Sequence, residues 1–430
     1  MIAEVPFSEL LTVVIDNRGK TCPTADAGIP LIATNCIRNE LLYPTYDKVR
    51  FVSKETYSNW FRGHPLPGDI IFVNKATPGR VCLVPDPVDF CIAQDMVAVR
   101  ANPKRVYPNY LFAVLRSPAV QEKIGQMHVG TLIPHFKKGD FDKLLLPIPE
   151  PEEQEFIGDT YFELSAKIDA NRRMNATLEA MAQALFQSWF VDFDPVRAKL
   201  DGRPPAALDP ATAALFPEHL EDSKLGHIPK GWEVKTVGDI GDVICGKTPP
   251  TSVADYYGED IPFITIPDMH GNVFGAATAR KLSHAGANSQ SNKTLPPGSL
   301  CVSCIATPGL VVITSEDSQT NQQINSVVPH QKEETYFWYW VMTGLGAEIA
   351  SSGSGGSVLV NLSKGRFETL QVIKPPHALI RDYHTTVRPL FEAILANTHQ
   401  SRTLATLRDT LLPKLLSGEL STAPITVTHN

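Results

Sequence analysis

Apolar side chains recur at alternating steps of four and three residues along the middle of the chain. This heptad spacing predicts a helix about 50 Å long, at a rise of about 1.5 Å per residue. The residues before it, PEPEE at 149–153, are typical of a helix start, because proline suits the first turn and acids face the positive end of the helix dipole. The stripe consists of Ile157, Tyr161, Leu164, Ile168, Asn171, Asn175, Leu178, Ala182, Leu185 and Trp189.

A different kind of segment follows this helix, which should end near Asp194-Pro195. Residues 194–230 are rich in proline, a residue that interrupts regular structure. The segment is therefore expected to be an irregular linker. Its prolines are Pro195, Pro204, Pro205, Pro210, Pro217 and Pro229.

The second half of the chain repeats the first. The clearest match has no gap, and it pairs PGDIIFVNKATPG with PGSLCVSCIATPG at an offset of 230 residues. Two shorter matches, IPLI with IPFI and KGDF with KGRF, have offsets of 232 and 226. The matches keep their order, and small offset changes are what loop insertions and deletions produce, so the chain is a tandem duplication. The matched segments are 67–79 with 297–309, 29–32 with 261–264, and 138–141 with 364–367.

The repeat places a second long helix at 377–420. Adding 226 to each position of the first stripe gives Tyr383, Val387, Leu390, Ile394, Asn397, Ser401, Leu404, Arg408, Leu411 and Leu415. Most of these positions stay apolar. Pro389 predicts a kink in this helix or a later start, because proline removes a helical hydrogen bond.

Two long helices with matching stripes each need a partner surface. The economical arrangement is an antiparallel coiled coil, in which Asn171 and Asn397 are polar members of the seam that fix its register. The antiparallel direction follows from an internal pseudo-two-fold symmetry. The alternative is that each helix caps only its own globular segment.

The globular segments, 1–150 and 231–376, have short β-branched runs separated by Gly/Pro turns, together with helical stretches. Such runs are 69–73, 97–99 and 311–314. The predicted fold class is α+β, with two similar domains in tandem and a long helix after each. The last ten residues, 421–430, form a tail.

Charge is unevenly spread along the chain, whose formal net charge is −7. Residues 1–150 carry 17 basic and 15 acidic side chains, whereas 151–193 carry 3 and 8, and 231–376 carry 9 and 13. Much of the excess acid thus lies on the predicted central helix. An acidic second domain predicts weak, salt-sensitive binding of any nucleic acid by the isolated chain and dependence on partner subunits for positive charge.

The remaining composition points to a cytoplasmic protein. No apolar run approaches the roughly 18 residues of a membrane helix, and the first residues lack the basic start of a signal peptide. The seven cysteines are scattered over a long chain and are expected to be buried thiols.

Two short motifs suggest cofactor chemistry that their surroundings disfavour. GDVICGKT at 241–248 matches the phosphate-binding loop pattern, but Pro249-Pro250 follows at once, whereas a phosphate-binding loop leads into a helix. A basic loop that contacts DNA and a plain turn are the remaining interpretations. Cys301 and Cys304 have zinc-like spacing, but no second pair lies near them, so buried thiols are the alternative.

The sequence resembles the specificity subunit of type I restriction-modification systems. The resemblance covers essentially the whole chain and rests on the duplicated plan together with three segments: PEPEEQ at 149–154, LGHIPKGWEV at 225–234 and LLPKLLSGEL at 411–420. The first domain departs from the pattern, since it begins with VPFSEL at 5–10 and has no Gly-Trp-Glu opening.

The resemblance implies a non-catalytic subunit that recognises double-stranded DNA. Each globular segment would be a target recognition domain for one half of a bipartite target, and the paired helices would set the spacing and dock two methyltransferase subunits. Restriction subunits would complete the assembly. S-adenosylmethionine, ATP and Mg are expected on the partner subunits, with no metal or cofactor in this chain. Because the two domains differ in sequence, the expected target is asymmetric, and a helix of about 50 Å suits half-sites one turn of about 34 Å or more apart.

Candidate DNA contacts follow from side-chain chemistry alone. Arg and Lys bind guanine edges or phosphates, and Asn and Gln pair with adenine. For each residue, the alternative is a solvated surface side chain. The candidates are Lys20, Asn35, Arg38, Lys75, Arg80, Lys137 and Lys138 in the first domain, and Lys247, Thr248, His270, Asn272, Arg280, Lys293 and Arg366 in the second.

Two other functions remain open. The chain could serve a modification-only or other phage-defence methyltransferase complex, which neighbouring genes would reveal. It could also be a two-headed protein scaffold that reads no DNA, which a footprinting assay with the methyltransferase would test.

Overall fold

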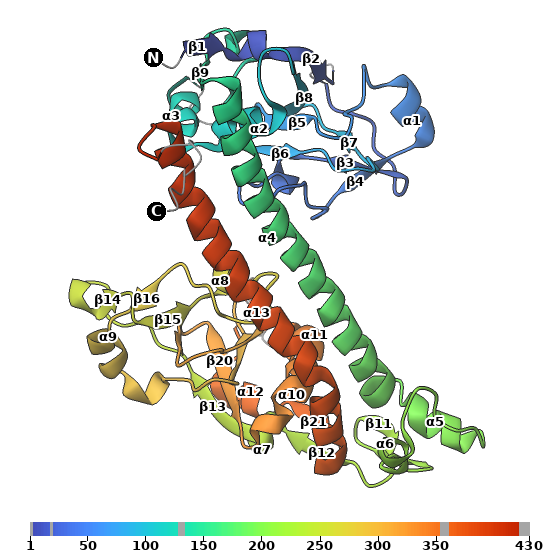
Figure 1. Ribbon diagram of the computed structural model, residues 1–430. Coiled ribbons are helices and arrows are strands. Elements are labelled where there is room, and N and C mark those ends of the chain that lie inside the picture. Colours follow the sequence, from blue (N-terminus) through green and yellow to red (C-terminus); the bar gives the residue numbers. More distant parts are fainter. Residues whose placement is uncertain (1–2, 18–19, 128–133, 353–360, 421–430) are drawn as a thin grey trace, which may run out of the picture. The chain divides into compact units, whose positions relative to one another are not determined.

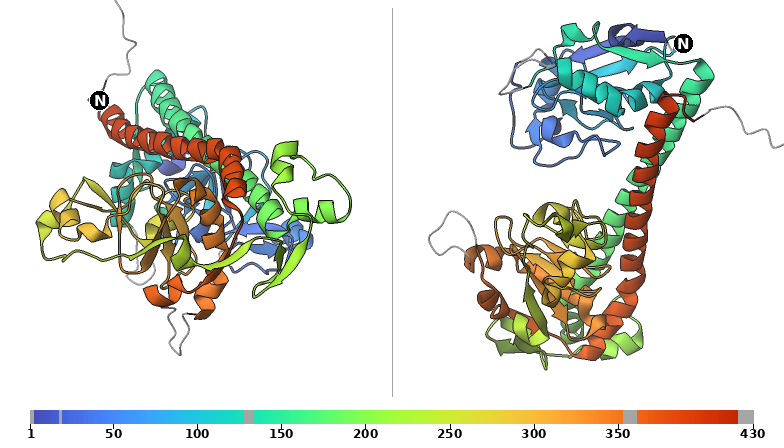
Figure 2. Two further views of the ribbon diagram at one scale, coloured as in Figure 1. Left: turned by 90° about the horizontal axis from the view of Figure 1, so that it is seen from below. Right: turned by 90° about the vertical axis from the view of Figure 1, so that its left-hand side faces the viewer.

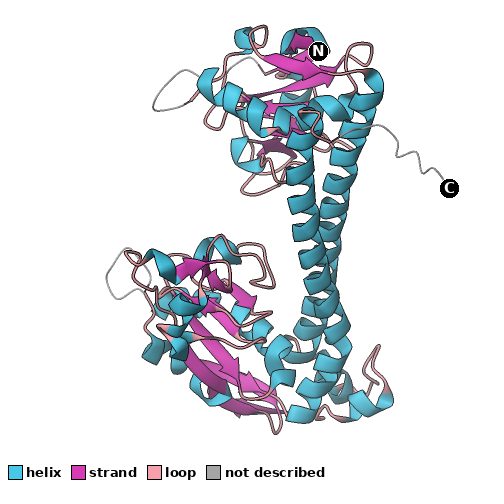
Figure 3. Cartoon of the chain, turned by 60° about the vertical axis from the view of Figure 1, so that its left-hand side comes forward, coloured by secondary structure: helices cyan, strands magenta, loops and turns pink. Residues whose placement is uncertain are grey.

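The computed structural model describes residues 3–17, 20–127, 134–352 and 361–420, so the expected tail lies outside the described residues. The chain divides into two compact units. The first unit comprises 1–171 and 401–430, and the second comprises 172–400. Each unit mixes helices with sheets (Figure 1, Figure 3), which confirms the α+β class.

The first unit is built on an antiparallel sheet in the order β2-β8-β5-β6, with a smaller sheet β4-β3-β7 and the pair β1-β9. Its strands are β1 Ala3–Pro6, β2 Leu11–Asp16, β3 Ile29–Ile32, β4 Arg50–Val52, β5 Ile70–Val73, β6 Val81–Leu83, β7 Cys91–Ile92, β8 Met96–Ala101 and β9 Leu145–Ile148. Its helices are α1 Lys54–Asn59, α2 Pro108–Arg116 and α3 Pro118–Met127, with 3-10 turns at Phe7–Leu10, Thr34–Cys36 and Lys138–Asp140.

Helix α2 is the centre of the first unit's core. Pro108 stands at its first turn, where no intrahelical donor is needed, and every residue from Tyr110 to Arg116 is buried. The core continues into Phe72 of β5 and into residues of both long helices, such as Tyr161 and Leu412. The central helix approaches α2 so closely at Gly158 that an added Cβ would lie 2.5 Å from the backbone nitrogen of Tyr110.

The second unit repeats the main sheet and the terminal strand pair of the first, but its smaller sheet has four strands, in the order β14-β16-β15-β19. Its main sheet has the order β13-β20-β17-β18, and the pair β12-β21 corresponds to β1-β9. The parallel pairing of β3 with β7 recurs as β15 with β19. Its strands are β10 Leu220–Ser223, β11 Gly226–Pro229, β12 Glu233–Thr236, β13 Gly241–Cys245, β14 Tyr257–Gly258, β15 Ile261–Ile264, β16 Lys281–Leu282, β17 Leu300–Ser303, β18 Val311–Ile313, β19 Gln319–Thr320, β20 Ile324–Pro329 and β21 Gln371–Lys374. Its short helices are α5 Asp194–Leu200, α6 Pro210–Ala214, α7 Val237–Ile240, α8 Ile266–Met269, α9 His284–Asn288, α10 Thr335–Gly344, α11 Gly346–Ser352 and α12 Lys364–Glu368.

The duplication extends to unusual backbone angles. Ala76 and Ala306 occupy equivalent turns and have positive φ angles of 67° and 65°. Gly79 and Gly309, three residues later, both have a φ angle of 87°. The Ala-Thr-Pro-Gly turns are therefore the same structure in both units.

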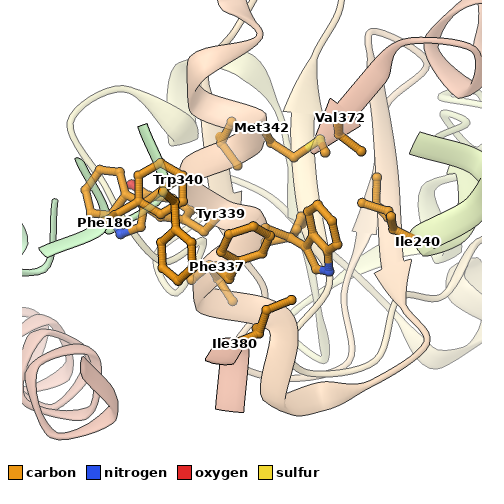
Figure 4. Close-up of a cluster of buried hydrophobic side chains, with 14 of the residues drawn as sticks. Phe186, Ile240, Phe337, Tyr339, Trp340, Met342, Val372 and Ile380 are labelled. Carbon is orange, nitrogen blue, oxygen red and sulfur yellow. The ribbon is translucent and has the colours of Figure 1, made fainter. Parts of the chain in front are cut away.

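The core of the second unit is rich in aromatic side chains. Helix α10 carries Phe337, Trp338 and Trp340, all of which are buried. Figure 4 shows Phe186, from the end of the central helix, beside Phe337 and Trp340, at ring separations of 5.7 and 6.4 Å. The core thus joins the sheet, α10 and the central helix.

The expectation of an irregular linker at 194–230 is wrong. The segment forms α5, α6 and the hairpin β10-β11. Pro195 and Pro210 stand in the first turns of α5 and α6, where proline favours a helix instead of ending one. The segment also buries Val196 and Phe216 in the core of the second unit.

The predicted long helices are α4 Pro151–Phe186, followed by a π-helical turn Gln187–Val191, and α13 His377–Leu416. They run antiparallel in both units. In the first unit, Asn171 Nδ2 donates to Ser401 Oγ at 3.2 Å and Arg408 Nη1 to Ser165 Oγ at 3.3 Å. In the second, Asn397 Nδ2 donates to Asn175 Oδ1 at 2.9 Å.

Each helix contributes to both cores. Leu412 and Leu415 of α13 belong to the core of the first unit, and Ala182 and Phe186 of α4 belong to the core of the second. The alternative in which each helix caps only its own globular segment is therefore wrong. The seam residues predicted from the heptad pattern are all buried or half-buried.

Pro389 does not delay the second long helix. Helix α13 begins at His377 and is continuous through Pro389. Figure 2 shows that the helix bends toward its N-terminal end, as expected where proline cannot donate a helical hydrogen bond.

Candidate nucleic-acid interface

In the first unit, three predicted cations gather beside the β5-β6 turn. Lys75 pairs with His135 in an isolated antiparallel bridge, and Lys137 and Lys138 follow His135 in the chain. Burial lowers the pKa of His135, and the positive charges of Lys75 and Lys137 lower it further. We call Lys75, His135, Lys137 and Lys138 the basic cluster.

The lysines of the basic cluster have carboxylates within reach. Lys75 Nζ lies 3.4 Å from Asp95 Oδ1, and Lys138 Nζ lies 3.6 Å from Asp16 Oδ2. Both pairs are substantially exposed, so each contributes little to stability. A phosphate can therefore replace these carboxylates at small cost.

A second group lies on the loop after β3. Arg38 is paired with Asp47 at 3.7 Å, and Asn35 Nδ2 donates to the Asp47 carbonyl at 2.7 Å. Arg80 Nη1 lies 3.4 Å from the carbonyl oxygen of Ile37. Asn35 and Arg38 lie on this loop, where Asn35 has a structural bond, and Arg80 contacts the loop from the turn between β5 and β6. Lys20 is exposed, and no hydrogen bond or ion pair among the described residues joins it to either group.

In the second unit, the GDVICGKT segment is not a phosphate-binding loop. Residues Gly241–Cys245 form β13, and residues 246–250 that follow are not helical. No helix N-terminus is therefore available to hold a phosphate after Lys247-Thr248.

The Gly246-Lys247-Thr248 segment instead packs against residues 319–322. Gly246 lies so close that an added Cβ would be 2.1 Å from the Asn321 carbonyl oxygen. Lys247 donates its backbone N–H to the Thr320 carbonyl at 2.9 Å. This packing leaves the Lys247 side chain exposed at the surface.

Glutamines surround this segment. Thr248 Oγ1 donates to Gln322 Oε1 at 2.8 Å, and Gln290 Nε2 donates to the Lys247 carbonyl at 2.7 Å. Gln290 also donates to Gln319 Oε1 at 2.8 Å. Gln290 and Gln319 are buried, whereas Gln322 is exposed and presents an amide beside Thr248.

The other predicted residues of the second unit do not form one site. His270, Asn272 and Arg280 share the loop around α8 and β16, where Asn272 Nδ2 donates to the Asp268 carbonyl at 3.0 Å and the Arg280 guanidinium lies 5.6 Å from the Phe263 ring. Lys293 lies near the glutamine network, since its N–H donates to the Gln290 carbonyl at 2.8 Å. Arg366 lies on α12, which contributes none of the other predicted residues.

Equivalent positions of the two units carry unlike side chains. The bridge between Lys75 and His135 in the first unit recurs as a bridge between Ile305 and Asn361 in the second. Two basic side chains thus correspond to one apolar and one amide side chain. The shared backbone therefore presents two different surfaces.

Nothing in the sequence pattern distinguishes His135, Gln290 or Gln322 from other polar residues. A histidine or glutamine becomes a candidate only when the fold places it beside another polar group. The polar run QTNQQ at 319–323 was the one available signal, because it places four amide side chains within five residues.

The cysteines are free thiols, and six of the seven are buried, as predicted. Burial raises the pKa of Cys301 to about 12 and that of Cys304 to about 11. Within the described residues, no three His, Cys, Asp or Glu side chains are grouped as metal ligands. None of the helices in that part of the chain is long and apolar enough to cross a membrane.

A duplicated α+β domain with paired helices and two unlike polar surfaces defines a class of two-domain recognition proteins. The family described as "Type I restriction modification DNA specificity domain" matches residues 14–180 and 229–378. The chain belongs to this family, and it is a specificity subunit without catalytic function of its own.

Several known proteins are similar to the chain. The type I restriction enzyme HindI specificity subunit of Haemophilus influenzae is 37% identical over 398 residues, which cover 82% of this chain and 86% of that protein. The MjaIX specificity subunit of Methanocaldococcus jannaschii is 26% identical, with 82% and 78% covered. A crystal structure of the type I S subunit from M. genitalium shares the fold, with a TM-score of 0.55 at 15% identity and 96% of each chain covered.

Proposed function

We propose that the chain recognises a bipartite, asymmetric DNA sequence and thereby directs adenine methylation and ATP-dependent cleavage by partner subunits. The observation that carries this proposal is the pairing of Lys75 with His135 in one unit and of Ile305 with Asn361 in the other. Two copies of one backbone with different side chains are suited to two different half-sites.

The two units would contact DNA with different chemistry. The basic cluster of the first unit offers lysines, which bind phosphates without reading sequence. The second unit offers the hydroxyl of Thr248 and the amide of Gln322, which can pair with base edges. We assign Lys247, next to these groups, to a phosphate.

The partners follow from the same proposal. Two methyltransferase subunits would dock on α4 and α13, and restriction subunits would join them. S-adenosylmethionine, ATP and Mg would bind to those partners. The excess of acidic over basic side chains in residues 151–193 favours a basic partner surface on α4.

The decisive experiment exchanges one domain. Residues 231–376 would be replaced by those of a family member with a different target, and the methylome of cells that express the hybrid with its methyltransferase would be sequenced. We expect one half of the methylated sequence to change while the other half and the spacer persist. A change in both halves, or methylation without any sequence preference, would refute the proposal.

A second experiment tests the role of the helices. One heptad would be deleted from α4, together with the heptad of α13 that faces it across the seam. This double deletion should change the number of base pairs between the half-sites. An unchanged spacer would contradict that role.

A third experiment tests for restriction. Loss of plasmid transformation when the restriction subunit is added distinguishes a restricting complex from a modification-only one.

A further inference from the structure

A cavity of about 320 Å³ lies in the first unit, and none of its lining residues belongs to the basic cluster. The end of α2, the start of α3 and both long helices enclose it. Two of its lining residues are buried arginines, Arg116 at 7% and Arg408 at 5% exposure. We call it the two-arginine cavity. Its polar lining residues are Asn39, Glu40, Arg116, Tyr161, Arg408 and Asp409.

Arg116 is a buried cation without a carboxylate partner. Its Nη2 donates to the Val81 carbonyl at 2.8 Å and to the Leu41 carbonyl, and its Nε lies 3.3 Å from the Val81 carbonyl. Its Nη1 is buried and has no hydrogen-bond partner among the described residues. A buried charge that lacks an opposite charge is costly, and an anion would remove that cost.

Arg408 adds a second positive charge to the same space. Its Nε donates to Asp409 Oδ1 at 2.8 Å, and its guanidinium lies 5.4 Å from the ring of Tyr161. Burial lowers the pKa of Arg116, and the hydroxyl of Tyr161 opposes this change. The charge of Arg408 lowers the pKa of Arg116 further, because the two guanidinium groups repel each other.

The acidic groups lie at the rim of the cavity. The side chain of Asp409 is 63% exposed, and Glu40 is also exposed. Pro118, the first residue of α3, lines the cavity as well, so the positive end of a ten-residue helix lies there. The interior is therefore positive although the lining as a whole has no net charge.

The equivalent positions of the second unit hold no cations. The repeat offset of 226 places Ala182 at the position of Arg408, and the offset of 227 between the first residues of α2 and α10 places Thr343 at that of Arg116. Ala182 is fully buried in that unit's core, and Thr343 Oγ1 donates to the Tyr339 carbonyl. Since the same fold forms without these arginines, the fold does not require them.

We propose that the two-arginine cavity binds a small anion that carries a phosphoryl group. Two guanidinium groups suit a phosphoryl group better than a carboxylate, because the phosphoryl group has about two negative charges and three acceptor oxygens. The cavity volume falls at the lower end of the range for small-molecule sites, about 300–1,000 Å³. None of the residues that line the cavity is among the candidate DNA contacts.

Calorimetric titration of the full chain with inorganic phosphate, at constant ionic strength, tests the proposal. Arg408→Gln should weaken phosphate binding at least tenfold, whereas Arg402→Gln, an exposed position on the same helix, should change it less than twofold. Glu40→Gln should tighten binding, because it removes a negative charge that acts on Arg408. This third variant keeps the test valid if Arg408→Gln does not fold.

Further titrations distinguish the sources of the anion. Tenfold tighter binding of adenosine monophosphate than of phosphate identifies a nucleotide, and equal binding identifies free phosphate. The absence of phosphate binding, equal losses in Arg408→Gln and Arg402→Gln, weaker binding by Glu40→Gln, or citrate binding as tight as phosphate would overturn the proposal.

Discussion

Replacing Gly246 by alanine should destabilise the second unit at the candidate DNA interface. The added Cβ would lie 2.1 Å from the Asn321 carbonyl oxygen and 2.5 Å from the Thr320 carbonyl oxygen. Ordinary contacts of a Cβ atom begin near 3.4 Å, and both oxygens belong to the backbone. The segment must therefore move by more than about 1 Å.

Such a shift breaks the hydrogen bonds that hold the segment. Gly246 N–H donates to the Ile324 carbonyl at 3.0 Å, and Lys247 N–H donates to the Thr320 carbonyl at 2.9 Å. A typical net contribution is about 0.5–1.5 kcal/mol per bond, so their loss costs about 1–3 kcal/mol. The lower flexibility of alanine in the unfolded chain returns about 0.4–1 kcal/mol, so the central values of the two ranges, about 2 and about 0.7 kcal/mol, leave a net loss of about 1.3 kcal/mol.

Gly365→Ala is the matched control, since Gly365 lies in α12 and nothing is within 4 Å of its added Cβ. Urea unfolding followed by tryptophan fluorescence is a suitable assay, because four of the five tryptophans, Trp189, Trp232, Trp338 and Trp340, belong to the second unit. In complex with the methyltransferase, Gly246→Ala should also reduce discrimination at one half-site only. Equal unfolding midpoints for Gly246→Ala and the wild-type protein would refute the reasoning.

Three further predictions concern buried or half-buried polar groups of the second unit. Glu334→Ala should lower the free energy of unfolding by about 2–3 kcal/mol. The Glu334 carboxylate is 1% exposed, accepts a hydrogen bond from Trp338 Nε1 at 2.8 Å and lies 3.3 Å from Lys374 Nζ. Urea unfolding is the measurement, and the exposed Glu333→Ala is the control. Asn397→Ala should lower the free energy of unfolding by about 1–2 kcal/mol in the same measurement, because it removes the 2.9 Å hydrogen bond to Asn175. Changing both asparagines to leucine should recover the loss. A single variant as stable as the wild-type protein would contradict this prediction. Burial lowers the pKa of His384, so the unfolded chain binds protons more readily than the folded chain. Stability should therefore be full above about pH 6.5 and decline as the pH falls below that value. His384→Phe, which keeps the stacking on Tyr336, should flatten the decline in unfolding midpoints between pH 7.5 and 5.5.

The long helices could be predicted from the sequence because their signal is local and periodic. A heptad stripe identifies the buried side of a helix without knowledge of its partner, and the internal repeat then located the second helix and its direction. The structure confirms this in the bonds of Asn171 with Ser401 and of Asn175 with Asn397.

Residues 194–230 show why local signals fail elsewhere. Prolines suggested a linker, but Pro195 and Pro210 occupy first turns, and the segment is held by the burial of Val196 and Phe216. That burial depends on side chains more than a hundred residues away, such as Phe337. No periodic pattern in so short a segment reports such contacts.

The candidate interface was predictable only in part, for the same reason. Lysines near the turns could be selected by charge, and the structure does gather Lys75, Lys137 and Lys138. His135 and Gln322 become candidates only through their neighbours, since their residue types are common on any surface.

The aromatic core of the second unit bears on how such proteins diversify. Phe186, Trp189, Phe190 and Phe216 all precede residue 231, yet they pack in one core with α10. A recombination event that replaces residues 231–376 replaces α10 as well. The new α10 must then pack against Phe186, Trp189, Phe190 and Phe216, which stay in the chain. Only donor domains whose α10 matches these side chains would yield a folded hybrid, so packing far from DNA limits which specificities a lineage can acquire.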